Sequence, residues 1–353
     1  MTKPITHVAT TDISEMLNAG TERRMDLPGF HDEFVDFPHF IIRITDEIWR
    51  QRNIEKCKDW YAEDCAIHTL AGDIIGAEIV TQNTYDTLKA FPDRTLDGDN
   101  VIWSDEGDGA FYSSHLITSK MTNEGASEFG PATGRSVLFQ TIAECLCKDN
   151  KVIEEWLARD NLALCTQLGF DPDAVARQQA NKDIENGINL IDLHKKNRTA
   201  IEKGGPLVAT TGSASKVAVE ALKATLSGAD LAELNGAYDF RADVKAPGGD
   251  LLYGTDQIGE WFGAHAGALS DITVSVDHIA EIPYLGHARD VSLRWGISAN
   301  HSGDGKYGPA TGAPLYILGV TQFRVMNNRV REATFIWDDI ALRRQVETAR
   351  QLS

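Results

Sequence analysis

The chain has 353 residues, of which 42% are hydrophobic, and its formal net charge at pH 7 is −18. This length exceeds the ~100–200 residues of an ordinary single domain, so two domains are expected. The acidic charge argues against nucleic acid as a partner, because phosphates require a basic surface, and against docking on an anionic membrane.

Two further features concern the compartment. No apolar run approaches the ~18 residues needed to span a membrane, and the opening sequence MTKPITHVATTDISEML has no apolar stretch of secretory type, so a cytoplasmic location is expected. An odd number of cysteines, all in the first half, favours buried reduced thiols over a disulfide framework. No metal site is expected at Cys145-x-Cys147, because no paired Cys or His motif follows it.

In chain order, residues 1–30 show little periodicity and are predicted to form an N-terminal arm. From Pro38 to Trp49, apolar residues recur at three- and four-residue spacing, which predicts a helix. Further helices are expected at 53–61 and 76–91, where Phe91-Pro92 ends the pattern. One strand is expected between these two helices, at 66–70. Four more are expected after them, at 96–103, 110–121, 136–147 and 152–160.

The remainder repeats this plan after a polar, helix-forming connector at residues 172–212. The helices expected in the second half are 216–226, 231–237, 255–269 and 341–352. The strands expected there are 240–244, 272–279, 288–299, 313–326 and 330–338.

The two halves are related by an internal repeat at one constant spacing. The segment GPATG at 130–134 recurs at 308–312, and the ungapped register continues on both sides. Further matching pairs are Gly76/Gly254, Asp93/Asp271, Asn150/Asn328, Glu154/Glu332 and Asp160/Asp338. The period is far longer than the ~20–50 residues of solenoid repeats, so the sequence predicts two whole domains, 31–171 and 213–353. Helices followed by an antiparallel meander predict an α+β fold for each.

Several short motifs of the first half carry a family resemblance. They are Trp60-Tyr61-Ala62-Glu63-Asp64, a strand with His68, Phe91-Pro92-Asp93, GPATG and the segment DNKVIEEW at 149–156. With this order of elements, residues 38–170 resemble the SnoaL-like polyketide cyclase family of the nuclear-transport-factor-2-like superfamily. Residues 216–345 resemble it mainly through the first half. The resemblance implies two tandem cone-shaped α+β barrels of cystatin-like type, each a curved antiparallel sheet wrapped around helices with a pocket between them.

The same resemblance implies where an active site would lie. In the cyclases an acid/base carboxylate directly follows the strand tryptophan, a position that here holds Leu157 and, in the second repeat, Phe335. The family's pocket histidine falls near Ala143 and Thr321. The sequence departs from the cyclase pattern at both positions, so other residues have to supply any acid–base chemistry.

In the first repeat, the candidate catalytic residues are His68, Glu144, Glu155 and Asp160. Chemistry at a carbon next to a carbonyl needs a base that works near pH 7, and an apolar pocket raises the pKa of a carboxylate toward that range. The alternatives stay open: His68 as a partly exposed strand histidine, and Asp160 as a helix cap. The candidate ligand-binding residues of this repeat are Trp103, Tyr112, His115, Phe139 and Trp156.

In the second repeat, the candidate ligand-binding residues are His278, Arg294, Trp337 and Asp338. Leu116 stands in the first repeat where the second has Arg294, so the two pockets are expected to differ. An inward arginine suits an acidic substrate or an enolate; pairing with surface acids is the alternative.

Three functions are compatible with the sequence. The first is a cofactor-independent lyase, isomerase or cyclase that acts on a small apolar or polyketide-like carbonyl compound. The second is a non-catalytic module that binds a small-molecule ligand, and the third is a structural pseudo-dimer. In each case the two repeats are expected to form an intramolecular pseudo-dimer, with a further homodimer as an open alternative.

Overall fold

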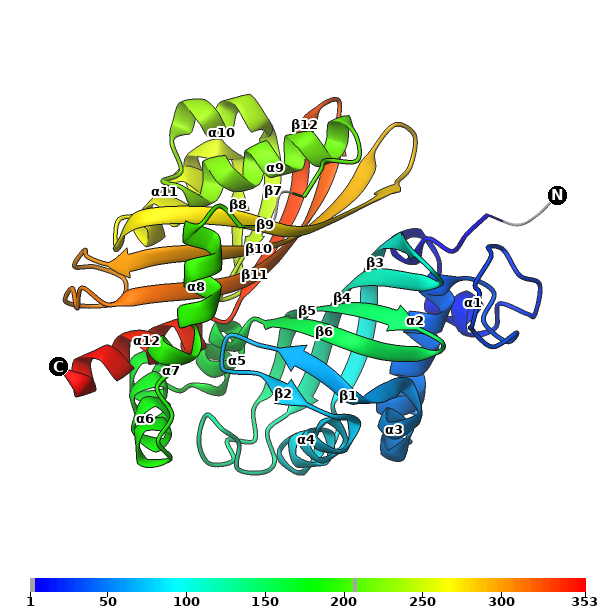
Figure 1. Cartoon of the computed structure of the whole chain (residues 1–353), viewed down its shortest axis with the longest axis horizontal. Helices are drawn as coiled ribbons and strands as arrows, with labels where there is room; N and C mark the ends of the chain where they lie inside the picture. Colours follow the sequence, from blue (N-terminus) through cyan, green and yellow to red (C-terminus); the bar gives the residue numbers. More distant parts are fainter. Residues whose placement is uncertain (1–3, 206–207) are drawn as a thin grey trace. The chain divides into compact units, whose positions relative to one another are not determined.

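The computed structural model describes residues 4–205 and 208–353 and divides into two compact units (Figure 1). The first unit comprises the described residues up to Thr69 together with Asp73–Leu157. The second comprises Leu70–Gly72 and Ala158–Ser353. Each unit contains one six-stranded sheet, as the duplicated sequence predicts.

The first unit has a mixed sheet in the order β2-β1-β6-β5-β4-β3. Its strands β1 and β6 are parallel, and the pairs β1–β2, β3–β4 and β4–β5 are antiparallel. The strands are β1 (Tyr61–His68), β2 (Ile74–Ile75), β3 (Thr95–Gly107), β4 (Ala110–Thr122), β5 (Ser136–Lys148) and β6 (Lys151–Arg159). The helices are α1 (Ile13–Leu17), α2 (Phe37–Thr45), α3 (Cys57–Trp60) and α4 (Ala77–Ala90), with short helical turns at Val8–Thr10, Asp46–Arg50 and Ile54–Lys56.

The core of this unit lies between α2 and one face of the sheet. Asp36 caps α2 by accepting a hydrogen bond from the His39 backbone N–H at 2.9 Å, which satisfies one of the free donors at the helix start. Phe40 of α2 packs edge-to-face against Phe30 and Phe34, with ring centroids 5.0 Å apart in both pairs. The predicted arm therefore contributes to the core. The apolar residues of the arm that are buried in this core are Val8, Met16, Leu27 and Phe30.

The second unit repeats the sheet in the order β8-β7-β12-β11-β10-β9, with β7 and β12 parallel. The strands are β7 (Tyr238–Ala246), β8 (Asp250–Tyr253), β9 (Leu269–Pro283), β10 (Arg289–His301), β11 (Pro314–Met326) and β12 (Arg329–Trp337). The helices are α5 (Asn161–Leu168), α6 (Pro172–Glu185), α7 (Leu190–Leu193), α8 (Lys195–Glu202), α9 (Ser213–Leu226), α10 (Leu231–Ala237), α11 (Gly254–Ala266) and α12 (Asp339–Leu352).

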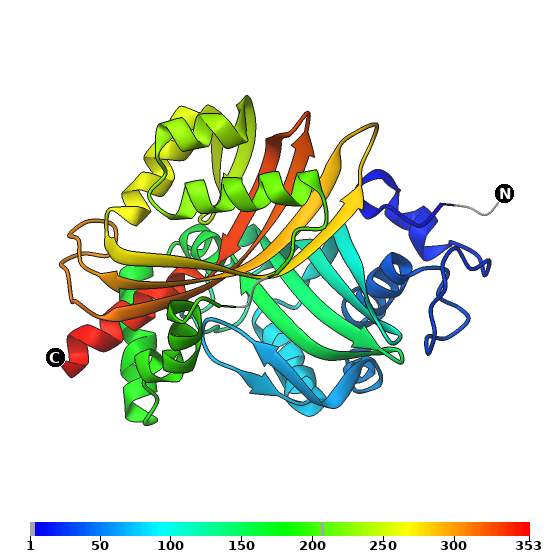
Figure 2. The same ribbon diagram turned by 45° about the horizontal axis from the view of Figure 1, so that its top comes forward.

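Helices cover both faces of the second sheet. Figures 1 and 2 show α9, α10 and α11 together on one side of it. On the other side, Ile201 of α8 lies against Gly296, where an added Cβ would approach the isoleucine to 2.9 Å. The helical segment that the sequence predicts as a connector is thus packed on the second repeat.

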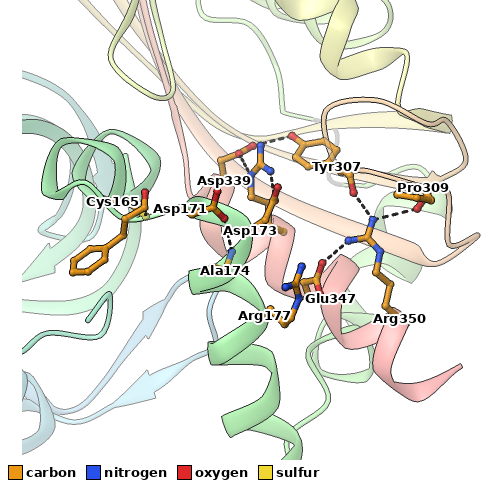
Figure 3. Close-up of polar contacts among 12 residues, drawn as sticks. Cys165, Asp171, Asp173, Ala174, Arg177, Tyr307, Pro309, Asp339, Glu347 and Arg350 are labelled. Atoms are coloured by element: carbon orange, nitrogen blue, oxygen red, sulfur yellow. Dashed lines mark hydrogen bonds and ion pairs between the residues drawn. The ribbon is translucent and has the colours of Figure 1, made fainter. Parts of the chain in front are cut away.

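The C-terminal helix α12 also holds α6 by ion pairs (Figure 3). Arg343 pairs with Asp173, and Arg344 pairs with Asp183. Arg177 Nε lies 3.2 Å from Glu347 Oε2.

The last glycine of the repeated GPATG segment has the same backbone conformation in both units. Gly134 has φ of +68° and Gly312 has φ of +69°. The Gly134 backbone N–H donates to Asn123 O, directly after β4, at 2.9 Å, and the Gly312 N–H donates to His301 O, at the end of β10, at 2.8 Å. Both glycines thus lie in the left-handed region of backbone conformation, which favours glycine. No helix within 4–205 and 208–353 is long and apolar enough to cross a membrane.

Candidate functional site

His68 of the first repeat lies between two acidic side chains. Its Nδ1 is 3.1 Å from Asp73 Oδ1, its Nε2 is 3.0 Å from Glu154 Oε1, and its ring stacks on Trp156. The hydrogen bond to Asp73, followed by the one to Glu154, raises the pKa of His68 against the opposing effect of burial. The carboxylates that contact His68 are thus Asp73 and Glu154 and not one of the other candidate catalytic residues, Glu144, Glu155 or Asp160.

The two buried glutamates of the first repeat lie on opposite faces of the sheet. Glu144 accepts a hydrogen bond from the Tyr112 hydroxyl, and it points away from its neighbour Cys145, because successive strand residues alternate. Burial raises the pKa values of Cys145 and Tyr61, and the charge of Glu155 raises them further, so Glu155 lies on the Cys145 side. The hairpin therefore does not bring these two candidate catalytic carboxylates together.

Asp160 and Asp338 cap helices. Asp160 accepts hydrogen bonds from the backbone N–H groups of Ala163, Gly248 and Gly249 at 2.8–3.1 Å. Burial raises its pKa to about 6, although these bonds favour the ionised form. Asp338 accepts from Ala341 N at 3.0 Å and from Asn161 Nδ2 at 2.6 Å. Asp160 and Asp338 thus both act as helix caps, which was the alternative interpretation of Asp160 in the sequence.

The expected wall residues of the first repeat lie in a packed interior. His115 is almost fully buried, and burial lowers its pKa to about 3. Phe139 is buried beneath the Arg94 guanidinium, whose centre is 5.8 Å from the ring centroid, and Trp103 packs at the edge of the core. A surface hollow of about 340 Å³ in this unit involves none of the predicted residues. Its lining is His31, Glu33, Glu47, Lys56, Asp59, Trp60, Asp149, Asn150 and Lys151.

The second repeat contains a small cavity between α9, α11 and the sheet. Its volume is about 30 Å³, enough for one or two water molecules. It is lined by Thr225, Leu226, Phe262, His265, Ala266, Leu269, Trp295, Ile297, Tyr307, Ile317 and Trp337. Trp337, a candidate ligand-binding residue, is thus part of the wall of this cavity. Arg294 precedes Trp295 and pairs with His278 across the strands, so both point to the opposite face and not into this cavity.

A buried polar cluster lies beside this cavity, centred on Asp339 at the first turn of α12. Asp339 Oδ1 accepts from the Tyr307 hydroxyl at 2.8 Å (Figure 3). The same oxygen accepts from Trp337 Nε1 at 3.4 Å, and Oδ2 accepts from Arg343 Nε at 2.9 Å. Burial alone would raise the pKa of Asp339, but His265, Arg343 and Lys306 hold it well below its ordinary value. The carboxylate is therefore ionised.

His265 of α11 connects this carboxylate to a lysine. Its Nε2 lies 3.8 Å from Asp339 Oδ1 and has no hydrogen-bond partner within the described residues. Its Nδ1 lies 3.3 Å from Lys306 Nζ, and its ring stacks on Trp261 with centroids 4.1 Å apart. Burial lowers the pKa of His265, and the charge of Lys306 lowers it further against the effect of Asp339.

Two neighbours of His265 Nδ1 select between its tautomers, since Trp261 O and Lys306 Nζ both lie 3.3 Å from it. With the proton on Nδ1 the ring donates to the Trp261 carbonyl; with the proton on Nε2, facing Asp339, Nδ1 accepts from a protonated Lys306. This neutral histidine can give a proton on one side or accept one on the other. The cluster therefore has the parts of a proton-transfer site: a neutral imidazole, a fixed anion and a nearby cation.

None of this cluster is kept in the first repeat. At the same register, His265, Lys306, Tyr307 and Asp339 are replaced by Thr87, Glu128, Phe129 and Asn161. Sequence reasoning missed all four residues. Two signals in the sequence could have pointed to them. One is that the residues directly before the repeated GPATG segment differ between the repeats; the other is the four-residue spacing of Trp261 and His265, which places two rings on one face of a helix.

Comparison with known families supports the fold of the first repeat. Residues 39–168 match the SnoaL-like polyketide cyclase family model. The first repeat is therefore SnoaL-like, and the second repeats its sheet order and element sequence.

Solved structures with a similar fold are each matched over a single-repeat length. AclR from Streptomyces galilaeus is 22% identical, with 37% of this chain and 94% of AclR covered and a TM-score of 0.33. IdmH from Streptomyces antibioticus is 22% identical, with coverage of 38% and 99% and a TM-score of 0.33. A SnoaL-like polyketide cyclase from Agrobacterium tumefaciens is 16% identical, with coverage of 37% and 97% and a TM-score of 0.32. A search of curated proteins finds no match.

Proposed function

We propose that this SnoaL-like protein catalyses proton transfer next to the carbonyl group of a small compound, without a cofactor, at the buried cluster of the second repeat. The observation that carries this proposal is the position of His265, between the Asp339 carboxylate and the Lys306 ammonium at the wall of a largely apolar cavity. This is the acid–base chemistry of a lyase, isomerase or cyclase.

The cluster meets the requirements of that chemistry. A general base has to be unprotonated at the working pH, and burial keeps His265 neutral. Once His265 accepts a proton, the imidazolium is stabilised by Asp339, whose position is fixed by Tyr307 and Arg343. The negative charge that develops on the substrate needs a positive partner, and Lys306 is the cation next to the ring.

The first repeat has a supporting role in this proposal. It lacks the cluster, and its His68 is paired with two carboxylates that favour the protonated imidazolium, which is a poor base. The presence of two copies in one chain supports an intramolecular pair of repeats resembling the homodimers of the superfamily.

Exchange of α-hydrogens tests the proposal without knowledge of the natural substrate. The chain is incubated in D₂O with a panel of small ketones and β-keto esters, and exchange is followed by NMR. We expect exchange above the rate in buffer, reduced ~10²–10⁴-fold in His265→Asn, as for loss of a positioned acid–base group. The matched control His68→Asn should retain the wild-type rate. Equal rates in wild type and His265→Asn would exclude His265 as the base.

A structural function is the second candidate, and the cavity volume favours it. About 30 Å³ is a tenth of the ~300 Å³ at which ligand sites begin, so only the reacting end of a substrate fits without side-chain movement. Ligand binding without exchange in the same NMR samples would indicate a binding module. Neither binding nor exchange across the panel would indicate a structural protein.

A further inference from the structure

We propose that Lys306 is a nucleophile that condenses with a carbonyl ligand to form an imine, with His265 as the group that moves the protons. This inference rests on the proposed function of the same cluster and names its substrate class more closely, as an aldehyde or ketone. It also replaces the electrostatic role of the Lys306 cation with a covalent one, because a protonated imine takes up the electron pair when an α-proton is removed.

The surroundings of Lys306 differ from those of a surface lysine. Its side chain is half-buried, with Nζ 4.4 Å from the centroid of Trp261 and 3.3 Å from His265 Nδ1. Within the part of the chain that the structure describes, it has no carboxylate within 4.0 Å. Lys56, Lys58 and Lys89 by contrast each pair with an acidic side chain at 2.7–3.0 Å.

Attack on a carbonyl needs the unprotonated amine, so the Lys306 ammonium first has to lose a proton, and its surroundings make this loss easier than for a surface lysine. Burial lowers the pKa of Lys306, and Arg343 adds to this, although Asp339 and more distant aspartates act in the opposite direction. The imidazole nitrogen next to Nζ is the acceptor for the proton that the amine has to lose. The flexible four-carbon stem of lysine allows Nζ to move from this contact toward a ligand at the His265 ring.

The step is balanced without an oxidant or reductant. The Lys306 ammonium gives one proton to His265, and its nitrogen then forms a bond to the carbonyl carbon as the π electron pair moves to oxygen. A second proton passes from the nitrogen to this oxygen, and His265 returns the first proton to the resulting hydroxyl group, which leaves as water as the C=N bond forms. The net change is ammonium plus carbonyl to protonated imine plus water. The protonated imine then accepts the electron pair released at the neighbouring carbon.

Reductive trapping tests this chemistry on the full chain. The protein is incubated at pH 7 with propanal or acetone and sodium cyanoborohydride, and the modified lysines are identified by peptide mass spectrometry. We expect Lys306 to be labelled at least tenfold faster than any other lysine. Lys306→Arg should remove this fast labelling, and the exposed control Lys203→Arg should leave it unchanged.

The outcomes separate this inference from the function on which it rests. Labelling spread evenly over the lysines, or fast labelling that persists in Lys306→Arg, would overturn it. If His265-dependent hydrogen exchange occurs but Lys306 is not labelled, imine formation is excluded and the acid–base function stands. If Lys306 is labelled rapidly but no exchange occurs, the imine stands and the proposed function fails. Thermal melts of Lys306→Arg and Lys306→Gln establish that loss of labelling is not loss of folding.

Discussion

Asp339 Oδ1 lies 3.8 Å from Nε2 of His265, while Tyr307, Trp337 and Arg343 hold the same carboxylate by hydrogen bonds. The carboxylate thus belongs both to the packing of α12 and to the environment of the histidine. Stability and chemistry at this cluster are expected to depend on the same side chain.

Replacing Asp339 should destabilise the protein more than replacing its neighbour. Asp339→Asn removes the charge that faces buried Arg343, and breaking a buried ion pair costs about 3–5 kcal/mol. Asp338→Asn keeps a capping side chain, and Asn and Asp cap about equally well, so its expected cost is small. Urea unfolding of both variants checks the order; equal unfolding free energies would contradict the role of Asp339.

The ion pairs between α6 and α12 should contribute unequally to the free energy of unfolding. The Arg344 and Asp183 side chains are only 15% and 6% exposed, whereas Arg177, which faces Glu347, is 59% exposed. Arg344→Met should therefore cost several kcal/mol by leaving Asp183 buried and unpaired. Arg177→Met should cost at most about 1 kcal/mol. Thermal or urea unfolding measures both, and a larger loss in Arg177→Met would reverse the interpretation.

The last glycine of GPATG should be equally important for stability in the two units. Gly134→Val and Gly312→Val force a β-branched residue into the left-handed region and should each cost about 1–3 kcal/mol. Gly236→Val is the control, because Gly236 has an ordinary φ and open space around its Cα. Unchanged melting temperatures in both loop variants would refute a structural role for the segment.

Acid should destabilise the fold through buried histidines. Burial lowers the pKa of His115 to about 3 and that of His39 to about 4. Between these values and the ordinary value of about 6.5, the unfolded chain binds the extra protons, so stability falls as pH falls, by up to about 1.4 kcal/mol per pH unit for each group.

Unfolding of wild type and His115→Gln between pH 4 and 7 isolates one of these groups. The difference in stability between the two proteins should shift in favour of the variant as pH decreases. Asp160, whose pKa is raised to about 6, contributes the opposite slope between pH 3.8 and 6, but it is present in both proteins and cancels. A pH-independent difference would contradict the burial of a neutral His115.

The first repeat should not form a stable, soluble monomer when it is separated from the second. Residues 1–172 expressed alone are expected to be insoluble or dimeric, because the exposed face of a sheet needs to be covered. Size-exclusion chromatography with light scattering measures the state of this fragment. A stable, soluble monomer would contradict the intramolecular pair.

The fold could be predicted from the sequence because its determinants are local and repeated. The spacing of apolar residues, the turn residues of GPATG and the ungapped register were sufficient to predict two α+β sheets. Sequence pattern also supported the capping role of Asp160, since a carboxylate between a strand and a helix is a common N-cap. It did not predict that the β1–β6 pair is parallel, because pairing direction depends on how distant strands meet.

The sequence by itself determined the duplication, the SnoaL-like fold and the places where the cyclase residues are missing. Only the tertiary structure decided which polar side chains share a site. His265, Lys306 and Asp339 come from a helix, a loop and the start of another helix, and no spacing rule links them. Side-chain direction separates Arg294, on one face of its strand, from Trp295 at the cavity. A one-residue difference likewise separates the capping Asp338 from Asp339 in the cluster, because consecutive residues at a helix start point in different directions.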